Sequence, residues 1–243
     1  MCLANVATAD PSAETLEISV GENYGIMTML NGLLIEPRWN PYLDVEYQRG
    51  NVFASTQTGV GYKLINAPRF TGGFAMNYQN GRNTSSDSRY RGMGNVPAEL
   101  APSLFTEWKP LGDALDVYVE AGQSIGRNPS LYGTLEITAG FPITADVNGF
   151  IDLLGMGGSA RYEQTFYGVT ALQSERTNYP VYRPAGGVTQ VTATTGIVYS
   201  YSSNWSVTVD VGARRYVGGA AESPLTSPTP RAVANIVMTY RVW

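Results

Sequence analysis

Two carboxylates two residues apart, Asp44 and Glu46, are a pair that could act as an acid and a base. Paired carboxylates of this kind are the catalytic groups of glycoside hydrolases. Residues i and i+2 of a strand also share one face, so the lining of an interior explains the pair more simply. Composition excludes other chemistry, because the chain has no histidine and a single cysteine, Cys2. A Ser-His-Asp triad, a Cys-His pair, a histidine-bound metal, a zinc cluster and an intrachain disulfide are all impossible. We therefore expect no enzyme activity and no cofactor.

Charged side chains recur on the polar face of several alternating segments. In a soluble sheet that face would meet water, whereas in a barrel it would line the lumen and its charges would pair across it. The charges that we expect to face the lumen are Asp44, Glu46, Asp116, Glu120, Glu136, Asp210, Arg214 and Arg241, with Glu17 and Lys63 beside them. Their acidic excess would favour cations if a path through the lumen exists.

Two polar segments could make contacts outside the chain. Arg82, Asp87 and Arg91 could bind an anion such as a lipopolysaccharide phosphate or a substrate carboxylate. A solvated loop stiffened by its own salt bridges is the simpler interpretation, because exposed charge clusters are common. Tyr179, Tyr182 and Arg183 lie among prolines and could form either a protein-contact loop or a loop held by its own aromatic side chains.

The elements that must position these residues are strands with one apolar face. Residues 231–243 show the pattern best, because Ala234, Ile236, Met238 and Tyr240 alternate with polar side chains up to a terminal Trp243. Period-2 alternation indicates a strand with two different faces, and this strand is about long enough to cross a bilayer core at a barrel tilt. Trp108, Trp205 and Trp243 are most simply interfacial anchors.

Short and long connections alternate along the chain, which is typical of bacterial outer-membrane barrels. The short ones lie near Asn66, Leu111, Thr144 and Ser203, and the longer ones near Arg82, Arg127, Gln173 and Ser223. We predict an all-β fold, an antiparallel transmembrane up-and-down β-barrel of about 10–12 strands, over residues 15–243. Twelve strands follow if residues 52–64 form two short strands, and ten follow if the first alternating segment, residues 16–21, lies outside the wall. The expected strand at 150–162 is rich in glycine, and residues 27–41 are expected to form a loop.

The chain ends and totals add three expectations. Ala7-Thr8-Ala9 matches a signal-peptidase site, so residues 1–14 are interpreted as a signal-peptide remnant followed by a linker. No run of about 18 apolar residues occurs, so we expect no transmembrane helix. The net charge of -4 gives no electrostatic support for a nucleic-acid partner.

Several motifs, taken in order, resemble the MipA/OmpV family. They are Tyr78-Gln-Asn-Gly-Arg82, Asp87-Ser-Arg-Tyr-Arg-Gly-Met-Gly94, Phe166-Tyr-Gly-Val169, Pro180-Val-Tyr182, Trp205-Ser-Val-Thr and Gly219-Ala-Ala-Glu-Ser-Pro224. The chain departs from the family in two places, because it lacks the usual loop motif after the first strand and ends Tyr240-Arg-Val-Trp243 rather than Tyr-x-Phe.

The resemblance implies a barrel in the outer membrane of a Gram-negative bacterium with a non-enzymatic role. It implies a scaffold for cell-wall machinery, with a lytic transglycosylase and a murein synthase as partners and with outer-membrane lipid or lipopolysaccharide around the barrel. The acidic inner face leaves a second function open, a narrow channel for small or cationic solutes. A soluble β-sandwich or lipocalin-like binder is a third alternative.

Overall fold

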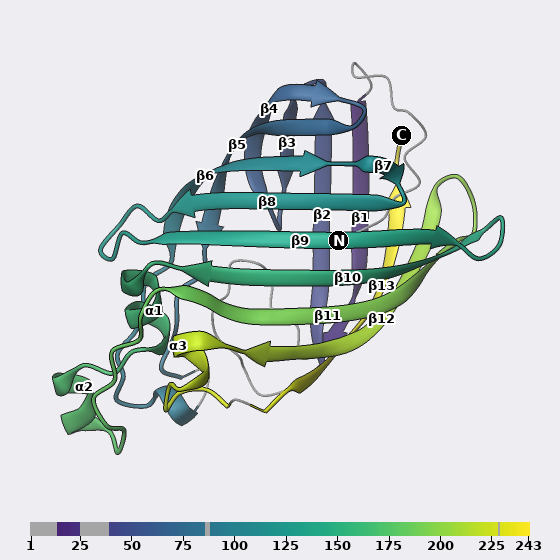
Figure 1. Ribbon diagram of the computed structural model, residues 1–243. Helices are drawn as coiled ribbons and strands as arrows, with labels where there is room; N and C mark the ends of the chain where they lie inside the picture. Colours follow the sequence, from purple (N-terminus) through teal and green to yellow (C-terminus); the bar gives the residue numbers. More distant parts are fainter. Residues whose placement is uncertain (1–13, 25–38, 86–87, 228) are drawn as a thin grey trace.

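Twelve antiparallel strands close into a barrel in the computed structural model, which describes residues 14–24, 39–85, 88–227 and 229–243 (Figure 1). Going around the wall, the order is β1-β13-β12-β11-β10-β9-β8-β6-β5-β4-β3-β2. Each strand therefore pairs with its neighbour in sequence, and β1 closes the ring by pairing with β13. The short β7 lies in the connection between β6 and β8, outside the ring.

The strands of the wall are mostly 9 to 14 residues long, whereas β3 has 4. In chain order the elements are β1 (Glu14–Tyr24), β2 (Trp39–Arg49), β3 (Val52–Ser55), β4 (Gly59–Ala67), β5 (Phe70–Gln79), the 3-10 helix η1 (Ser88–Tyr90), β6 (Glu99–Trp108), β7 (Pro110–Asp113), β8 (Leu115–Gln123), β9 (Leu131–Pro142), β10 (Val147–Gly158), α1 (Ala160–Tyr167), α2 (Ala171–Arg176), β11 (Gly187–Ser200), β12 (Trp205–Tyr216), α3 (Gly218–Ala221) and β13 (Arg231–Arg241).

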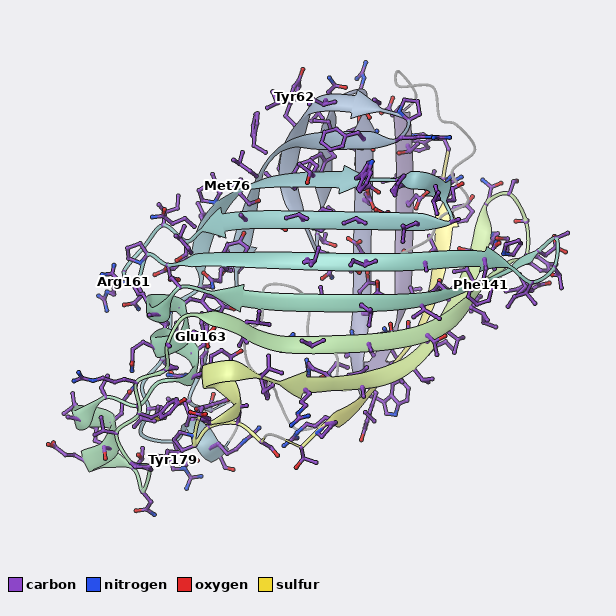
Figure 2. All side chains as sticks on the ribbon, viewed as in Figure 1. Tyr62, Met76, Phe141, Arg161, Glu163 and Tyr179 are labelled. Carbon is purple, nitrogen blue, oxygen red and sulfur yellow. The ribbon has the colours of Figure 1, made fainter. Side chains whose placement is uncertain are left out.

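The outer surface of the wall is apolar. Large side chains in mid-strand point outward and stay exposed, as for Leu104 (67% exposed) and Leu64 (65%). Tyr62 and Met76 also project outward (Figure 2). Soluble monomers rarely expose so large a continuous apolar surface, and lipid covers such a band in transmembrane barrels. The predicted transmembrane β-barrel is confirmed.

The two ends of the barrel differ in the length of their connections. Short turns join β2 to β3, β4 to β5, β6 to β8, β9 to β10 and β11 to β12, and we call this side the turn end. Longer segments join β5 to β6, β10 to β11 and β12 to β13 on the opposite side, the loop end, where all three helices lie (Figure 1). The expected alternation of short and long connections is therefore present, except that the short turn 56–58 joins β3 to β4 on the loop side.

The strand count is resolved as twelve. Residues 52–64 contain a hairpin in which β3 ends and β4 begins, and the first segment forms part of the wall as β1. Backbone pairing shows both features. Strands β3 and β4 pair as a hairpin, and β1 pairs with β2 on one side and with β13 on the other.

Two boundaries differ from the sequence-based prediction. The strand expected at 150–162 stops at Gly158, because the Ser159 side chain caps a helix by accepting a bond from the Tyr162 N–H. The loop expected up to Pro41 is shorter, since Trp39 already begins β2. Pro41 is tolerated there because it lies close to the strand end. The remainder of that loop and the expected signal-peptide remnant lie outside the described residues, so both stay predictions.

None of the helices in the described part of the chain is long and apolar enough to cross a membrane.

Candidate functional site

The inner wall of the barrel is polar, and part of it forms one hydrogen-bonded network. Glu120 on β8 lies at its centre, and the Tyr118 hydroxyl donates to its Oε2 at 2.9 Å. The Tyr132 hydroxyl on β9 and the Asn77 amide on β5 both donate to its Oε1. Asn77 also donates to Ser103 on β6 at 3.1 Å. A buried carboxylate with several donors is stabilised by them, so this network joins the inner faces of β5, β6, β8 and β9.

The acidic residues on the opposite wall are more open. Strand β2 lies across the barrel from β9 in the strand order. Asp44 on β2 is half-buried and accepts from Ser55 at 3.0 Å and Thr56 at 2.8 Å, whereas Glu46 is exposed. These two carboxylates therefore line the more accessible side of the lumen, and both have the carboxylate chemistry to attract cations.

The other charges expected on the inner face lie at buried or half-buried positions of the wall. Asp116, Glu136 and Arg214 are buried on β8, β9 and β12. Asp210 on β12 is buried and accepts two 3.0 Å bonds from Asn235 on β13. These charged residues alternate with exposed apolar residues along their strands, which places the charged side chains on the inner face of the wall.

Helix α1 fills part of the barrel at the loop end. Its Tyr162, Phe166 and Tyr167 are buried and pack into one aromatic cluster with inward-facing Tyr132 of β9 and Tyr216 of β12. The Tyr162 and Phe166 rings lie 4.9 Å apart between centroids, and the Tyr167 and Tyr216 rings 5.7 Å apart. We call α1 with this cluster the aromatic cap. The aromatic cap covers the part of the lumen between β9 and β12, the two strands that contribute aromatic side chains to it.

The aromatic cap contains a buried acid, Glu163, which is 1% exposed (Figure 2). Its Oε1 accepts from the Thr189 hydroxyl at 2.5 Å, and its Oε2 has no hydrogen-bond partner. Burial raises the pKa of Glu163 to about 7, although the Thr189 bond opposes the shift. This side chain is therefore poised to change protonation near neutral pH.

Arg82, expected in a solvated loop, is instead buried at the loop end. Its backbone pairs with Val96, at 2.9 Å and 2.8 Å, and this bridge fixes the segment between β5 and β6. The guanidinium lies 5.3 Å from the Tyr90 ring centroid and donates to the Phe166 carbonyl at 3.2 Å. Burial lowers the pKa of Arg82. The expectation of a solvated position was wrong for Arg82, because the loops fold over it.

The other expected interaction residues are divided between exposed and packed positions. Arg91 and Arg183 are exposed, whereas Asp87 lies outside the described residues. Tyr179 and Tyr182 pack against a buried cluster in the loops that consists of Tyr90, Met93, Val169 and Leu225. The Tyr182 hydroxyl donates to the Gly219 carbonyl at 2.7 Å. Both tyrosines thus hold the loops together, the second of the two interpretations made from the sequence.

Sequence reasoning missed three residues at the loop end. Arg127 and Arg161 line a cavity together with Arg82, and Glu163 is buried under the same helix that carries Arg161. Arg127 was assigned only to one of the longer connections, and residues 160–162 to a strand. The Ser159-x-x-Tyr162 capping position was the one local signal for the helix. Within the described residues, no group of three or more Cys, Asp or Glu side chains is arranged to hold a metal ion.

At the turn end, apolar side chains lie on three separate connections. Leu111 follows β6, Ile143 follows β9 and Tyr201 follows β11. They are 68%, 54% and 74% exposed. Trp108, Trp205 and Trp243 are exposed at the same end. This end therefore offers apolar contact area to whatever lies next to it.

This chain is similar to one protein family and to solved barrel structures. The family model described as MltA-interacting protein MipA matches residues 32–242. No curated protein matches this chain. Among solved structures, the NanC porin aligns with a TM-score of 0.52 at 9% identity, covering 93% of this chain and 98% of that one. That likeness is one of fold. The COG4313 outer membrane channel from Pseudomonas putida F1 aligns with a TM-score of 0.45 at 8% identity, covering 96% and 97%.

Proposed function

This chain belongs to the MltA-interacting protein MipA family, and on that premise we propose that it is a non-enzymatic scaffold in the outer membrane of a Gram-negative bacterium. Its proposed partner is a lytic transglycosylase of the MltA type, the interaction that the family name describes. A murein synthase held at the same time would complete the scaffold. Lipid and lipopolysaccharide would surround the apolar band.

The observation that carries this proposal is the set of exposed apolar side chains at the turn end. In bacterial barrels the short turns face the periplasm, where murein and the enzymes that cut it lie. Leu111, Ile143 and Tyr201 stand on three different turns, so a partner that contacts all three would bind a broad surface. Clustered apolar and aromatic side chains are the usual anchors of such contacts.

Binding of a purified lytic transglycosylase to the immobilised barrel tests the proposal. We expect Leu111→Asp, Ile143→Asp and Tyr201→Asp each to weaken binding by about tenfold or more, because each places a charge in the contact. The matched control is Leu172→Asp on α2, since Leu172 is 54% exposed at the opposite end. No binding by the unaltered barrel, or an equal loss with Leu172→Asp, would overturn the proposal.

A second candidate function is a narrow path for cations through the lumen. It is favoured by the accessible acidic face of β2, where Asp44 is half-buried and Glu46 exposed. Current across a planar bilayer tests it. An open path requires stable current steps that fall when Glu46→Gln removes a carboxylate, and a correctly inserted but silent barrel would exclude it.

A further inference from the structure

A cavity of about 640 Å³ opens among the loops at the loop end, away from the turns where a partner is proposed to bind. Its volume is in the range of small-molecule sites. Its lining includes Arg82, Arg127 and Arg161, with Asn95, Asn128 and Gln164 beside them. We call it the arginine pocket.

The three arginines come from three different connections. Arg82 precedes β6, and Arg127 lies between β8 and β9. Arg161 lies on α1, as Figure 2 shows. Among the described residues, no aspartate or glutamate lines the pocket, and none forms a salt bridge with any of the three arginines. Three cations around one cavity repel one another unless an anion lies between them.

Arg82 supplies a second, independent sign of a ligand. Its side chain is 3% exposed, and its Nε has no hydrogen-bond partner within the described part of the chain. A buried donor left without a partner costs free energy, about 1–3 kcal/mol for typical groups. An acceptor atom in the pocket would supply the missing bond.

The pocket is built by contacts that do not need a ligand. The Arg82–Val96 backbone bridge fixes one side. The Asn128 backbone N–H donates to Glu99 at 3.1 Å and holds the connection that carries Arg127. Gln173 on α2 donates to the Met93 carbonyl at 2.6 Å. Such preorganisation lowers the entropy that a ligand loses on binding.

We propose that the arginine pocket binds a phosphorylated sugar. Guanidinium groups match phosphate in shape and charge, and three of them suit a dianion better than a single carboxylate. The amides of Asn95, Asn128 and Gln164 provide donors and acceptors for sugar hydroxyls. The phosphorylated sugar could be a free solute or the headgroup of a lipopolysaccharide in the surrounding leaflet, because both present the same chemistry to the loop end.

Calorimetric titration of the folded protein in detergent micelles tests the proposal, with glucose 6-phosphate as probe and glucose as neutral control. We expect the phosphate ester to bind and glucose not to bind. Arg127→Gln and Arg161→Gln should each weaken binding by about tenfold. Both side chains are exposed, so these variants keep the fold even if Arg82→Gln disturbs it. Arg183→Gln, which removes an exposed loop arginine outside the pocket, should leave binding unchanged.

A second titration uses lipopolysaccharide with and without its phosphates. Binding of glucose 6-phosphate that depends on Arg127 and Arg161 supports a free solute as the ligand. Binding of phosphorylated lipopolysaccharide alone, weakened by the same variants, supports a lipid headgroup. The proposal is overturned if neither probe binds, if removal of phosphate has no effect, or if Arg127→Gln and Arg161→Gln bind as the unaltered protein does. A failed partner-binding experiment at the turn end would leave these outcomes intact.

Discussion

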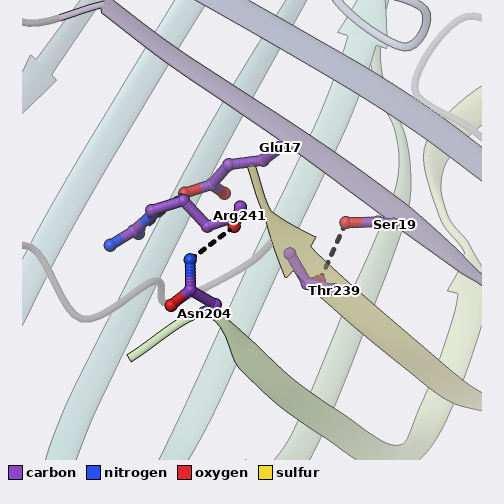
Figure 3. Close-up of polar contacts among 5 residues, drawn as sticks. All are labelled: Glu17, Ser19, Asn204, Thr239 and Arg241. Atoms are coloured by element: carbon purple, nitrogen blue, oxygen red, sulfur yellow. Dashed lines mark hydrogen bonds and ion pairs between the residues drawn. The ribbon is translucent and has the colours of Figure 1, made fainter. Parts of the chain in front are cut away.

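Arg241 on β13 directs two guanidinium nitrogens, Nε and Nη2, to one carboxylate oxygen of Glu17 on β1, each at 2.7 Å (Figure 3). The two residues are direct partners in the register that joins the last strand to the first. Two residues along the same seam, the Ser19 and Thr239 hydroxyls lie 2.8 Å apart. The barrel is therefore closed by side chains on the lumen face as well as by its backbone ladder.

Replacing Arg241 by glutamine should weaken this seam. We expect Arg241→Gln to lower the free energy of unfolding by about 1 kcal/mol, because the ion pair is partly shielded from water. Urea unfolding followed by tryptophan fluorescence measures the change. Arg215→Gln, on the outer face of β12, is the control and should have little effect. A double-mutant cycle with Glu17→Gln should give a coupling energy of about 0.5 kcal/mol or more, and purely additive losses would show that the pair does not stabilise closure.

Alternation predicted the wall well because a strand in a barrel has two chemically different faces. The Glu17–Arg241 pair illustrates this, since both residues fell on the polar face of segments identified from period 2 alone. The strand count was harder, because β3 has only 4 residues before the polar turn Ser55-Thr-Gln-Thr-Gly59, too few to show a clear alternation. Backbone pairing of β3 with both β2 and β4 settles it.

The loss of stability caused by a charge on the outer face should depend on how deep in the membrane the charge lies. Leu104 lies in the middle of β6, and Leu131 begins β9 at the loop end. We expect Leu104→Arg to lower the free energy of unfolding in lipid vesicles by about 2–4 kcal/mol, and Leu131→Arg by about 0–1 kcal/mol. Equal costs at the two positions would mean that lipid does not cover the middle of this wall.

The loop end could not be predicted to the same extent. Arg82, Arg127 and Arg161 are far apart in sequence, and they meet because barrel closure brings three connections together. Helix α1 was missed because a glycine-rich strand runs directly into it, with weak alternation before the Ser159 cap. Which loops contact one another depends on tertiary packing, and the periodicity of a local segment carries no information about it.

Truncating the aromatic cap should open the lumen on this side. Phe166 is 3% exposed and packs against Tyr162, so Phe166→Ala should cost the cap about 3–5 kcal/mol of packing. We expect the variant to pass more current across a planar bilayer than the unaltered barrel. Leu172→Ala, on the exposed face of α2, controls for effects of loop substitution. Equal currents in all three proteins would show that the cap does not limit passage.

The stability of the aromatic cap should fall as the pH rises toward neutrality. Between the ordinary pKa of 4.5 and the folded value of about 7, Glu163 binds a proton in the folded cap but not in the unfolded one. Unfolding therefore releases a proton in this window, so stability decreases with rising pH, by up to about tenfold in the opening equilibrium per pH unit. The contribution of Glu163 to the stability of the cap is constant below pH 4.5 and again above about pH 7.

Glu163→Gln removes this dependence, because glutamine stays neutral while its carbonyl still accepts from Thr189. Limited proteolysis at residues 160–167 measures cap opening, and the ratio of cleavage rates between the unaltered protein and the variant cancels the protease's own pH response. We expect a ratio that rises steadily from pH 4.5 to 7 and then levels off. Thr189→Val is the companion variant, which should loosen the cap at every pH by removing the hydroxyl donor. A ratio that does not change with pH would show that Glu163 does not hold a proton in the folded cap.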